Sequence, residues 1–276
     1  MNYIKSLSFI LFFVFIFSSC EDQVMIDLDS TVPKIVVDAV INDQPGPYYV
    51  KITKSSDYYQ PNNFATINNA VVTISDNLGN SEELVETSEG LYATQNIKGT
   101  RGVVYTLKVS IDGKTYSSNN MIPLEKVDID SLSYRFEDGS SIFYDEGYYF
   151  SSHFQDPSNI KNYYRGKVLI NGQVYDFNNE DMSKNRDYDT NFWLINDKFS
   201  NGKYKNIKYP HKLKKGDIVS YELENLSEST YIYYRTLVDI IRGSNVAPAN
   251  PISNFSEGVL GYFGAYSVDF KTIVIN

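Results

Sequence analysis

Cysteine and histidine are scarce in this chain, and the common catalytic motifs are missing. Its 276 residues include one cysteine, Cys20, and two histidines, His153 and His211. The sequence holds no HExxH or CxxC spacing, no G-x-S-x-G elbow, no P-loop and no dinucleotide-type glycine pattern. Neither histidine has an acid nearby at catalytic spacing. These absences argue against an enzyme, although a Ser/His/Asp triad stays open because its members need not be adjacent in sequence.

Basic residues are also in short supply. The chain carries 25 Lys and Arg against 34 Asp and Glu, a formal net charge of -9. Nucleic-acid binding and a polybasic membrane-surface patch both depend on clustered Lys and Arg, so neither is expected. Apolar residues make up 42% of the chain, enough for a globular core, and the 24 Tyr and 16 Phe favour a β-rich fold.

A long hydrophobic run is absent after the first 20 residues. Lys5 is followed by an apolar stretch, Leu7–Phe17, and then by two small residues before Cys20. This order is typical of a secretory signal, and the run is too short for an ordinary transmembrane helix. Residues 17–20, FSSC, resemble a loose bacterial lipobox, whose cysteine is acylated. We therefore expect a signal peptide at 1–19 and a lipidated tether at 20–33; a cleaved signal followed by a free cysteine is the alternative.

Short polar patterns add to the prediction of a surface lipoprotein. Glu21 and Asp22 resemble the acidic export signal that sends lipoproteins of Bacteroidota-type bacteria to the outer face of the outer membrane. A solvated tether is the alternative. Ser30 and Ser131 lie in Asp-Ser/Thr-type tripeptides that resemble the O-glycosylation sequon of the same bacteria.

Residues 34–126 alternate in the manner of β-strands. About seven short apolar-polar runs are separated by Asn-, Asp-, Gly- and Pro-rich turns, and Asp112-Gly113 is a strong hairpin signal. This pattern predicts an immunoglobulin-like β-sandwich, with a domain boundary near residue 126.

Residues 127–276 predict a second β-rich domain. Asn171-Gly172 is another hairpin signal, whereas residues 227–242 have helical periodicity between a Ser227 N-cap and Gly243. We expect one amphipathic helix packed on the second sheet. Residues 243–258 are rich in Pro, Asn, Ser and Gly and predict a long loop, a kind of segment that often carries function.

A calcium loop is the one metal site that the sequence suggests. The segment 187–193, DYDTNFW, begins with D-x-D-x-N, but Phe192 replaces the glycine and Lys198 the final glutamate of an EF-hand. An EF-hand is therefore rejected. A simpler Ca²⁺ site made of Asp187, Asp189 and Asn191 remains open beside the reading as a solvated acidic loop, and no other cofactor is expected.

Tyrosine-rich and glycine-rich stretches are candidates for a partner or ligand surface. Tyrosine offers a rigid area plus a hydroxyl, which suits stacking on sugars or clamping a peptide. The candidate residues are Tyr58, Tyr59, Tyr148, Tyr149, Tyr262 and Phe263. The alternative is that they belong to strand cores. Gly258, Gly261 and Gly264 allow tight turns or a close backbone approach, and they predict a last hairpin.

Three stretches carry a resemblance to a known family. They are residues 33–59 (PKIVVDAVINDQPGPYYVKITKSSDYY), 156–165 (DPSNIKNYYR) and 254–267 (NFSEGVLGYFGAYS). The chain resembles the DUF4249 family of Bacteroidota outer-membrane lipoproteins over most of its mature length. Members of that family are commonly encoded beside TonB-dependent transporters, and the family brings no established enzymatic activity to carry over.

The resemblance implies a non-enzymatic accessory or ligand-capture subunit of a TonB-dependent transporter, a SusC-like barrel in the outer membrane. It would be lipid-anchored and face the cell exterior, and a peptide or a glycan would be its ligand. Two other classes stay open: a structural or assembly lipoprotein, and a secreted hydrolase.

Overall fold

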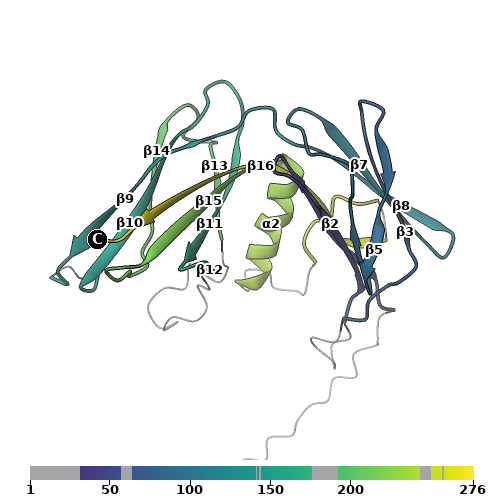
Figure 1. The fold of residues 1–276 in the computed structure, drawn as a ribbon, viewed down its shortest axis with the longest axis horizontal. Coiled ribbons are helices and arrows are strands. Elements are labelled where there is room, and N and C mark those ends of the chain that lie inside the picture. Colours follow the sequence, from purple (N-terminus) through teal and green to yellow (C-terminus); the bar gives the residue numbers. More distant parts are fainter. Residues whose placement is uncertain are drawn as a thin grey trace, which may run out of the picture. The chain divides into compact units, whose positions relative to one another are not determined.

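The computed structural model describes residues 32–56, 64–140, 142, 144–175, 192–242, 250–256 and 258–276. Residues Pro33–Asn276 form one compact unit. The described part is mainly β, with a single helix, and this confirms the predicted fold class (Figure 1). No described helix is long and apolar enough to cross a membrane. The division into 34–126 and 127–276 stays a prediction about the two halves of this unit.

The first half is a two-layer sandwich. One layer has the strand order β16-β1-β2-β6-β5, and the other has the order β4-β3-β7-β8. The bounds are β1 Ile35–Asn42, β2 Tyr49–Lys54, β3 Val71–Asp76, β4 Ser81–Glu83, β5 Val85–Ser88, β6 Leu91–Ala93, β7 Val104–Ile111 and β8 Lys114–Met121. Between the layers lies a mostly aliphatic core that includes Val37, Ile52, Val72 and Leu107.

The second half repeats this arrangement with other strands. One layer continues the long sheet in the order β12-β11-β15-β16, with β13 also paired to β11, and the facing layer has the order β14-β10-β9. The bounds are β9 Ile129–Glu137, β10 Gly147–Gln155, β11 Tyr163–Ile170, β12 Gln173–Val174, β13 Trp193–Asn196, β14 Tyr204–Lys208 and β15 Ile218–Leu226. Phe150, Tyr164, Tyr209 and Leu223 belong to its core.

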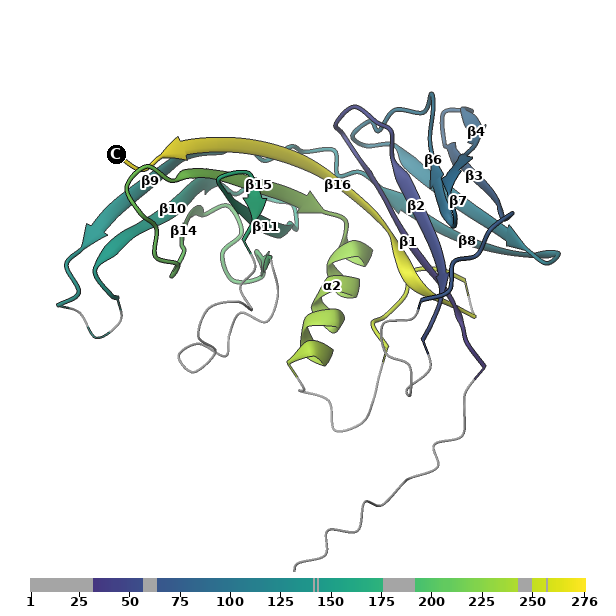
Figure 2. The same cartoon turned by 60° about the horizontal axis from the view of Figure 1, so that its bottom comes forward.

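Strand β16, Val259–Val274, belongs to both halves (Figure 2). Its first part pairs in parallel with β1, from Ile35–Val259 to Asn42–Tyr266, and its second part pairs antiparallel with β15. The expected hairpin at Gly258–Gly264 is therefore wrong. Gly261, at φ +90°, instead permits a close approach, because a Cβ there would lie 2.0 Å from the Val37 carbonyl oxygen.

The helix α2, Glu228–Ile241, packs on the outer face of the long sheet. Its predicted N-cap is confirmed, because the Ser227 hydroxyl accepts a hydrogen bond from the Thr230 amide at 3.3 Å. Buried tyrosines from α2, β11 and β16 meet there with Leu226 and Val268. Both predicted two-residue turns are present: Asp112-Gly113 and Asn171-Gly172 all have positive φ.

Candidate functional site

A loop at one end of the first sandwich, residues 94–100, is held in place by side chains from other strands. Glu82 is the middle residue of β4. Its carboxylate accepts hydrogen bonds from three consecutive backbone amides, those of Gln95, Asn96 and Ile97. The last two are 2.8 Å long. A charged acceptor makes such bonds stronger than neutral ones, so this carboxylate fixes the first half of the loop.

Two tyrosine hydroxyls hold the second half of the same loop. Tyr48 accepts from the Gly99 amide at 2.8 Å, and Tyr105 accepts from the Thr100 amide and donates to the Lys98 carbonyl, both at 2.8 Å. Gly99 also packs tightly against the backbone at the end of β1, because a Cβ there would lie 1.8 Å from the Asn42 carbonyl oxygen. The loop has no regular secondary structure, yet its backbone is preorganised by these contacts.

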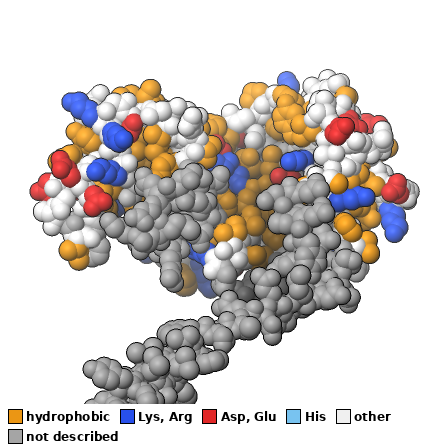
Figure 3. Space-filling view, turned by 90° about the horizontal axis from the view of Figure 1, so that it is seen from below, with side chains coloured by type: hydrophobic (Ala, Val, Ile, Leu, Met, Phe, Trp, Pro, Cys, Tyr) orange, Lys and Arg blue, Asp and Glu red, His pale blue; other side chains and the backbone are white. Residues whose placement is uncertain are grey.

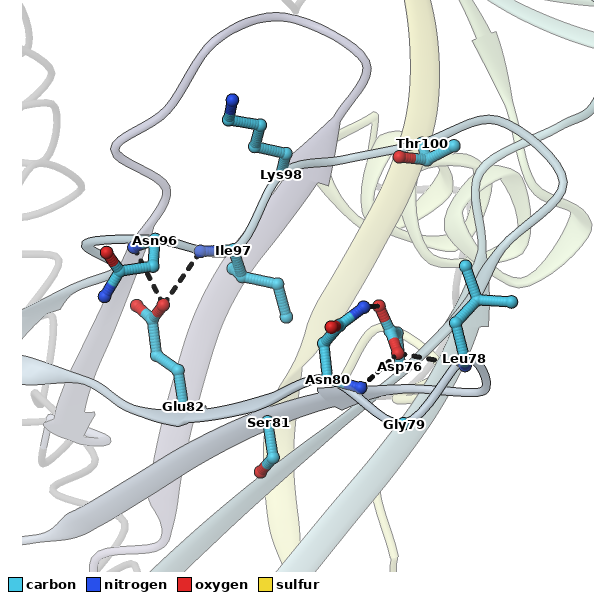
Figure 4. A pocket seen from close by; sticks show the side chains of 10 residues that line it. All are labelled: Asp76, Leu78, Gly79, Asn80, Ser81, Glu82, Asn96, Ile97, Lys98 and Thr100. Atoms are coloured by element: carbon cyan, nitrogen blue, oxygen red, sulfur yellow. Dashed lines mark hydrogen bonds between the residues drawn. The ribbon is translucent and has the colours of Figure 1, made fainter.

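Two hollows flank the 94–100 loop. One has a volume of about 590 Å³, and its walls include the β3–β4 turn at Asp76–Ser81 together with Asn96, Lys98 and Thr100 (Figure 4). The other has a volume of about 580 Å³ and lies against residues 43–48. Both volumes are in the range typical of small-ligand sites. Asn96, Ile97 and Lys98 line both hollows.

The polar side chains that line the first hollow differ in whether they already have hydrogen-bond partners. Asp76 accepts hydrogen bonds within its own turn from the Leu78 and Asn80 amides, and Glu82 is engaged by the loop backbone. Within the described residues, the side chains of Asn96 and Lys98 have no hydrogen-bond partner. An amide and an ammonium group are therefore available to a ligand, on a backbone that needs no rearrangement.

A second polar region lies on the outer face of the long sheet, partly beneath α2. Arg165 of β11 and Glu224 of β15 are both buried and form a two-point ion pair, with one contact of 2.7 Å. Lys167 lies 2.7 Å from Glu224 and 3.2 Å from Glu222. Because buried charges are costly unless they are paired, the four groups depend on one another.

The carboxylates of this network differ in acidity. Burial and, after it, the neighbouring Glu224 raise the pKa of Glu222 to about 7, although Lys167 acts in the opposite direction. For Glu224 burial acts in the same upward direction, but the charges of Arg165 and Lys167 win and hold its pKa at about 2. The two carboxylates of β15 thus differ in pKa because Glu224, unlike Glu222, is paired with Arg165.

Tyrosines extend the network across the sheet. The Arg165 guanidinium carbon lies 4.0 Å from the centre of the Tyr234 ring, a cation–π contact. Tyr234 is hydrogen-bonded through its hydroxyl to Tyr262, and Tyr262 stacks on Tyr233 with ring centres 4.2 Å apart. A chain of polar contacts therefore runs from Glu222 on β15 to the part of β16 that pairs with β1.

A comparison with models of protein families shows the family to which the chain belongs. A family model described as domain of unknown function DUF4249 matches residues 21–272. The chain belongs to the DUF4249 family. No curated protein matches the chain.

Within this DUF4249 chain, three of the residues predicted to form a partner surface are buried. Tyr149, Tyr262 and Phe263 are 3%, 7% and 1% exposed, so the prediction is wrong for them. The reason is packing: Phe263 lies in the first sandwich core and Tyr262 lies against α2. Tyr148 is half-buried and makes an edge contact with Phe136 at 5.1 Å between ring centres. Tyr58 and Tyr59 lie outside the described residues.

Several other predicted sites also lie outside the part that the structure describes. These are the lipidation site Cys20, the export signal Glu21 and Asp22, the sequon serine Ser30, and the calcium candidates Asp187, Asp189 and Asn191. Ser131 is exposed on β9. In the described ranges, no three His, Cys, Asp or Glu side chains are grouped as metal ligands.

The two histidines of the DUF4249 chain lie in different surroundings. His153 of β10 lies 2.7 Å through Nε2 from the Ser133 hydroxyl of β9 and stacks on Tyr204, whose ring centre is 6.3 Å away. His211 is partly buried, and burial lowers its pKa to about 4. The Ser133–His153 pair is the described feature nearest to a nucleophile and its base, and no described carboxylate is bonded to His153.

Sequence reasoning missed the ion network and the held loop. The signal for the network was present: Arg165 and Lys167 are two residues apart on one strand, and so are Glu222 and Glu224 on another. Residues two apart share a face of a strand, so opposite charges in two such pairs indicate neighbouring strands. The loop carried no comparable signal, because Glu82, Tyr48 and Tyr105 come together only in the folded chain.

Proposed function

We propose that this protein is a non-enzymatic, lipid-anchored outer-membrane lipoprotein that captures a ligand for a TonB-dependent transporter. The observation that carries the binding role is the preorganised 94–100 loop between two hollows. A loop that is already ordered loses little conformational entropy when a ligand binds, and so more of the contact energy appears as affinity. Binding sites are commonly built from such loops on a rigid β scaffold.

The anchor and the location rest on the N-terminal sequence. The apolar run before Cys20 and the acidic pair Glu21-Asp22 support export and surface display of an acylated chain. Two or three acyl chains hold a protein firmly to one leaflet, since each buried CH₂ contributes about 0.8 kcal/mol. The transporter partner rests on the family relationship and is the part of the proposal that an experiment must test directly.

The ligand that fits the first hollow is polar. Asn96 and Lys98 offer an amide and an ammonium group. A glycan or a peptide backbone supplies the matching hydroxyl, carbonyl or carboxylate groups. We expect the double variant Asn96→Ala/Lys98→Ala to lose ligand while the fold is unchanged. The control Asn119→Ala/Lys114→Ala removes the same two side-chain types from exposed positions on β8.

The first test is a pull-down of the tagged full-length protein from its own membranes in a mild detergent, read by mass spectrometry. Recovery of one TonB-dependent barrel at equal stoichiometry supports the proposal. The Cys20→Ala form and an untagged strain are the controls. The Cys20→Ala form has no acylation site, so we expect it to lose its membrane attachment and to recover no barrel. Recovery of intact lipoprotein alone would count against a stable transporter complex.

The pull-down, together with a ligand-retention and a hydrolysis assay on variants, distinguishes the other function classes. An assembly lipoprotein would bring down outer-membrane proteins with or without Asn96 and Lys98, and it would retain no small ligand. A hydrolase acting through Ser133 and His153 would show ester or amide hydrolysis that both Ser133→Ala and His153→Ala abolish. Either result would replace the ligand-capture role.

A further inference from the structure

The backbone amides of the 94–100 loop are already bonded inside the protein. The carboxylate of Glu82 and the oxygens of Tyr48 and Tyr105 accept hydrogen bonds from the amide of every residue in this described loop except Lys98. A ligand that approaches the loop therefore finds almost no backbone N–H donor left to bind.

The carbonyl groups of the same loop are acceptors that remain available. The peptide bonds are trans, so each C=O points away from the N–H that follows it, and the carbonyls of residues 94–96 point away from Glu82. In the part of the chain that the structure describes, the carbonyls of Gln95 and Asn96 accept no hydrogen bond. Figure 4 shows that the Lys98 side chain also points away from Glu82.

The second hollow lies on the carbonyl side of the loop. Its volume is about 580 Å³, and its walls are residues 94–99 and residues 43–48. Glu82 lines the first hollow and not the second, so the loop presents its amides to one side and its carbonyls to the other. Pro45 and Pro47 are exposed and give the second hollow an apolar wall.

The charges around the second hollow favour a neutral ligand. Asp43 is the acid in its lining, and this carboxylate accepts from the Val268 amide at 2.9 Å and lies 3.7 Å from Nε of Arg101. Carbonyl oxygens repel an anion, whereas the ammonium group of Lys98 repels a cation. Seen from below, the described surface also carries acidic and basic side chains interspersed (Figure 3), so that face attracts ligands of neither charge.

We propose that the second hollow binds a neutral glycan. A sugar hydroxyl both donates and accepts. It can therefore donate to the carbonyls of Gln95 and Asn96 while another accepts from the side chains of Lys98 and Gln95. The C–H face of a sugar ring packs against the proline wall at residues 45–47.

A peptide main chain matches the loop less well. Bound edge to edge, it presents N–H and C=O groups in alternation, and its carbonyls need N–H donors that the 94–100 loop no longer has. The inference rests on the proposed ligand-capture role and names the glycan, and not the peptide, as the ligand of that role.

The first experiment is a binding screen of the full-length protein in a polyoxyethylene detergent, which carries no sugar. The probes are neutral gluco-, manno-, galacto-, xylo- and fructo-oligosaccharides, and blocked trialanine, trilysine and triglutamate peptides, read by saturation-transfer NMR. We expect a neutral oligosaccharide to bind and the peptides not to bind. Binding of peptides alone would overturn the glycan inference and leave the capture role in place. Binding of no probe would overturn both.

One side chain distinguishes the second hollow from the first. Gln95 is exposed and lines only the second, so Gln95→Ala should weaken glycan binding several-fold and leave the melting temperature unchanged. Ser81→Ala changes an exposed residue that lines only the first hollow, and Gln173→Ala removes the same side-chain type from exposed β12. Neither control should alter binding. Full binding by Gln95→Ala, or loss with Ser81→Ala instead, would overturn the assignment.

Fluorinated sugars test the carbonyl acceptors directly. Fluorine is close in size to a hydroxyl group but donates no proton, so it cannot bond to the carbonyls of Gln95 and Asn96. In calorimetric titrations with monodeoxyfluoro analogues of the glycan that binds, we expect at least one position to lose roughly tenfold in affinity. Affinities equal to that of the parent sugar at every position would overturn the proposal.

Discussion

Strand β16 separates two cores of different chemistry. On its inner face, Phe263 and Ala265 pack with Val37, Ala39 and Ile41 in an aliphatic interior. On its outer face, Tyr262 and Tyr266 meet the tyrosines of α2 and the buried Arg165. Apolar contacts are insensitive to pH and additive in small steps, whereas buried charges stabilise only as complete sets. The same strand therefore supports one core that tolerates gradual change and one that does not.

Breaking the strand pair common to both cores should have the largest effect. Gly261→Ala places a Cβ 2.0 Å from the Val37 carbonyl oxygen at φ +90°, so β1 and β16 must separate. We expect a loss of about 5 kcal/mol or failure to fold, measured by urea unfolding. The control Gly113→Ala has φ +76° and nothing within 4 Å, so it should cost about 1 kcal/mol. Equal costs would show that backbone strain, and not the close approach, dominates.

Removing one charge should break the outer core alone. Arg165→Met leaves the fully buried carboxylate of Glu224 with Lys167 as its remaining ion-pair partner, and should lower the free energy of unfolding by about 3–5 kcal/mol. The control Arg235→Met opens an exposed pair with Asp239 and should change stability by less than about 1 kcal/mol. Similar losses in both variants would remove the distinction between the two environments.

The outer core should also show a pH dependence that the inner core lacks. Because the pKa of Glu222 is raised to about 7 in the folded state, its contribution is fully present below about pH 4.5 and is lost as the pH rises through 7. Glu222→Gln should remove this part of the profile, matching the parent protein near pH 4.5 and exceeding it at pH 8. The control Glu83→Gln changes an exposed carboxylate on β4. A parental slope between pH 5 and 8 in Glu222→Gln would contradict the assignment.

Shortening a side chain in the inner core should have the smallest effect on stability. Ile41→Val deletes one methylene at a fully buried position and should cost about 1 kcal/mol, with the same value at pH 5 and pH 8. Ile218→Val on the exposed flank of β15 is the control, since that residue is 47% exposed. A pH-dependent cost at Ile41 would show that the two cores are coupled.

The sequence by itself determined the local structure. Alternating apolar residues predicted the strands, Asp112-Gly113 and Asn171-Gly172 predicted two turns, and Ser227 predicted the start of α2. Each of these signals acts over a few residues, where turn chemistry and side-chain period decide the backbone. Other stretches, residues 33–59, 156–165 and 254–267, carried the resemblance to the DUF4249 family, which the family model confirms.

Only the tertiary structure decided which strands share a sheet and which side chains meet. The parallel pairing of β1 with β16 joins Asp38 to Tyr262 across more than 200 residues of chain, and Glu82 reaches the amides of a loop that it does not adjoin. The sequence predicted Tyr149, Tyr262 and Phe263 as candidates for a partner surface, but the tertiary packing buries all three. The physical reason is that charge pairing, burial and close approach depend on distances in space, and local propensity does not specify the partner of a strand.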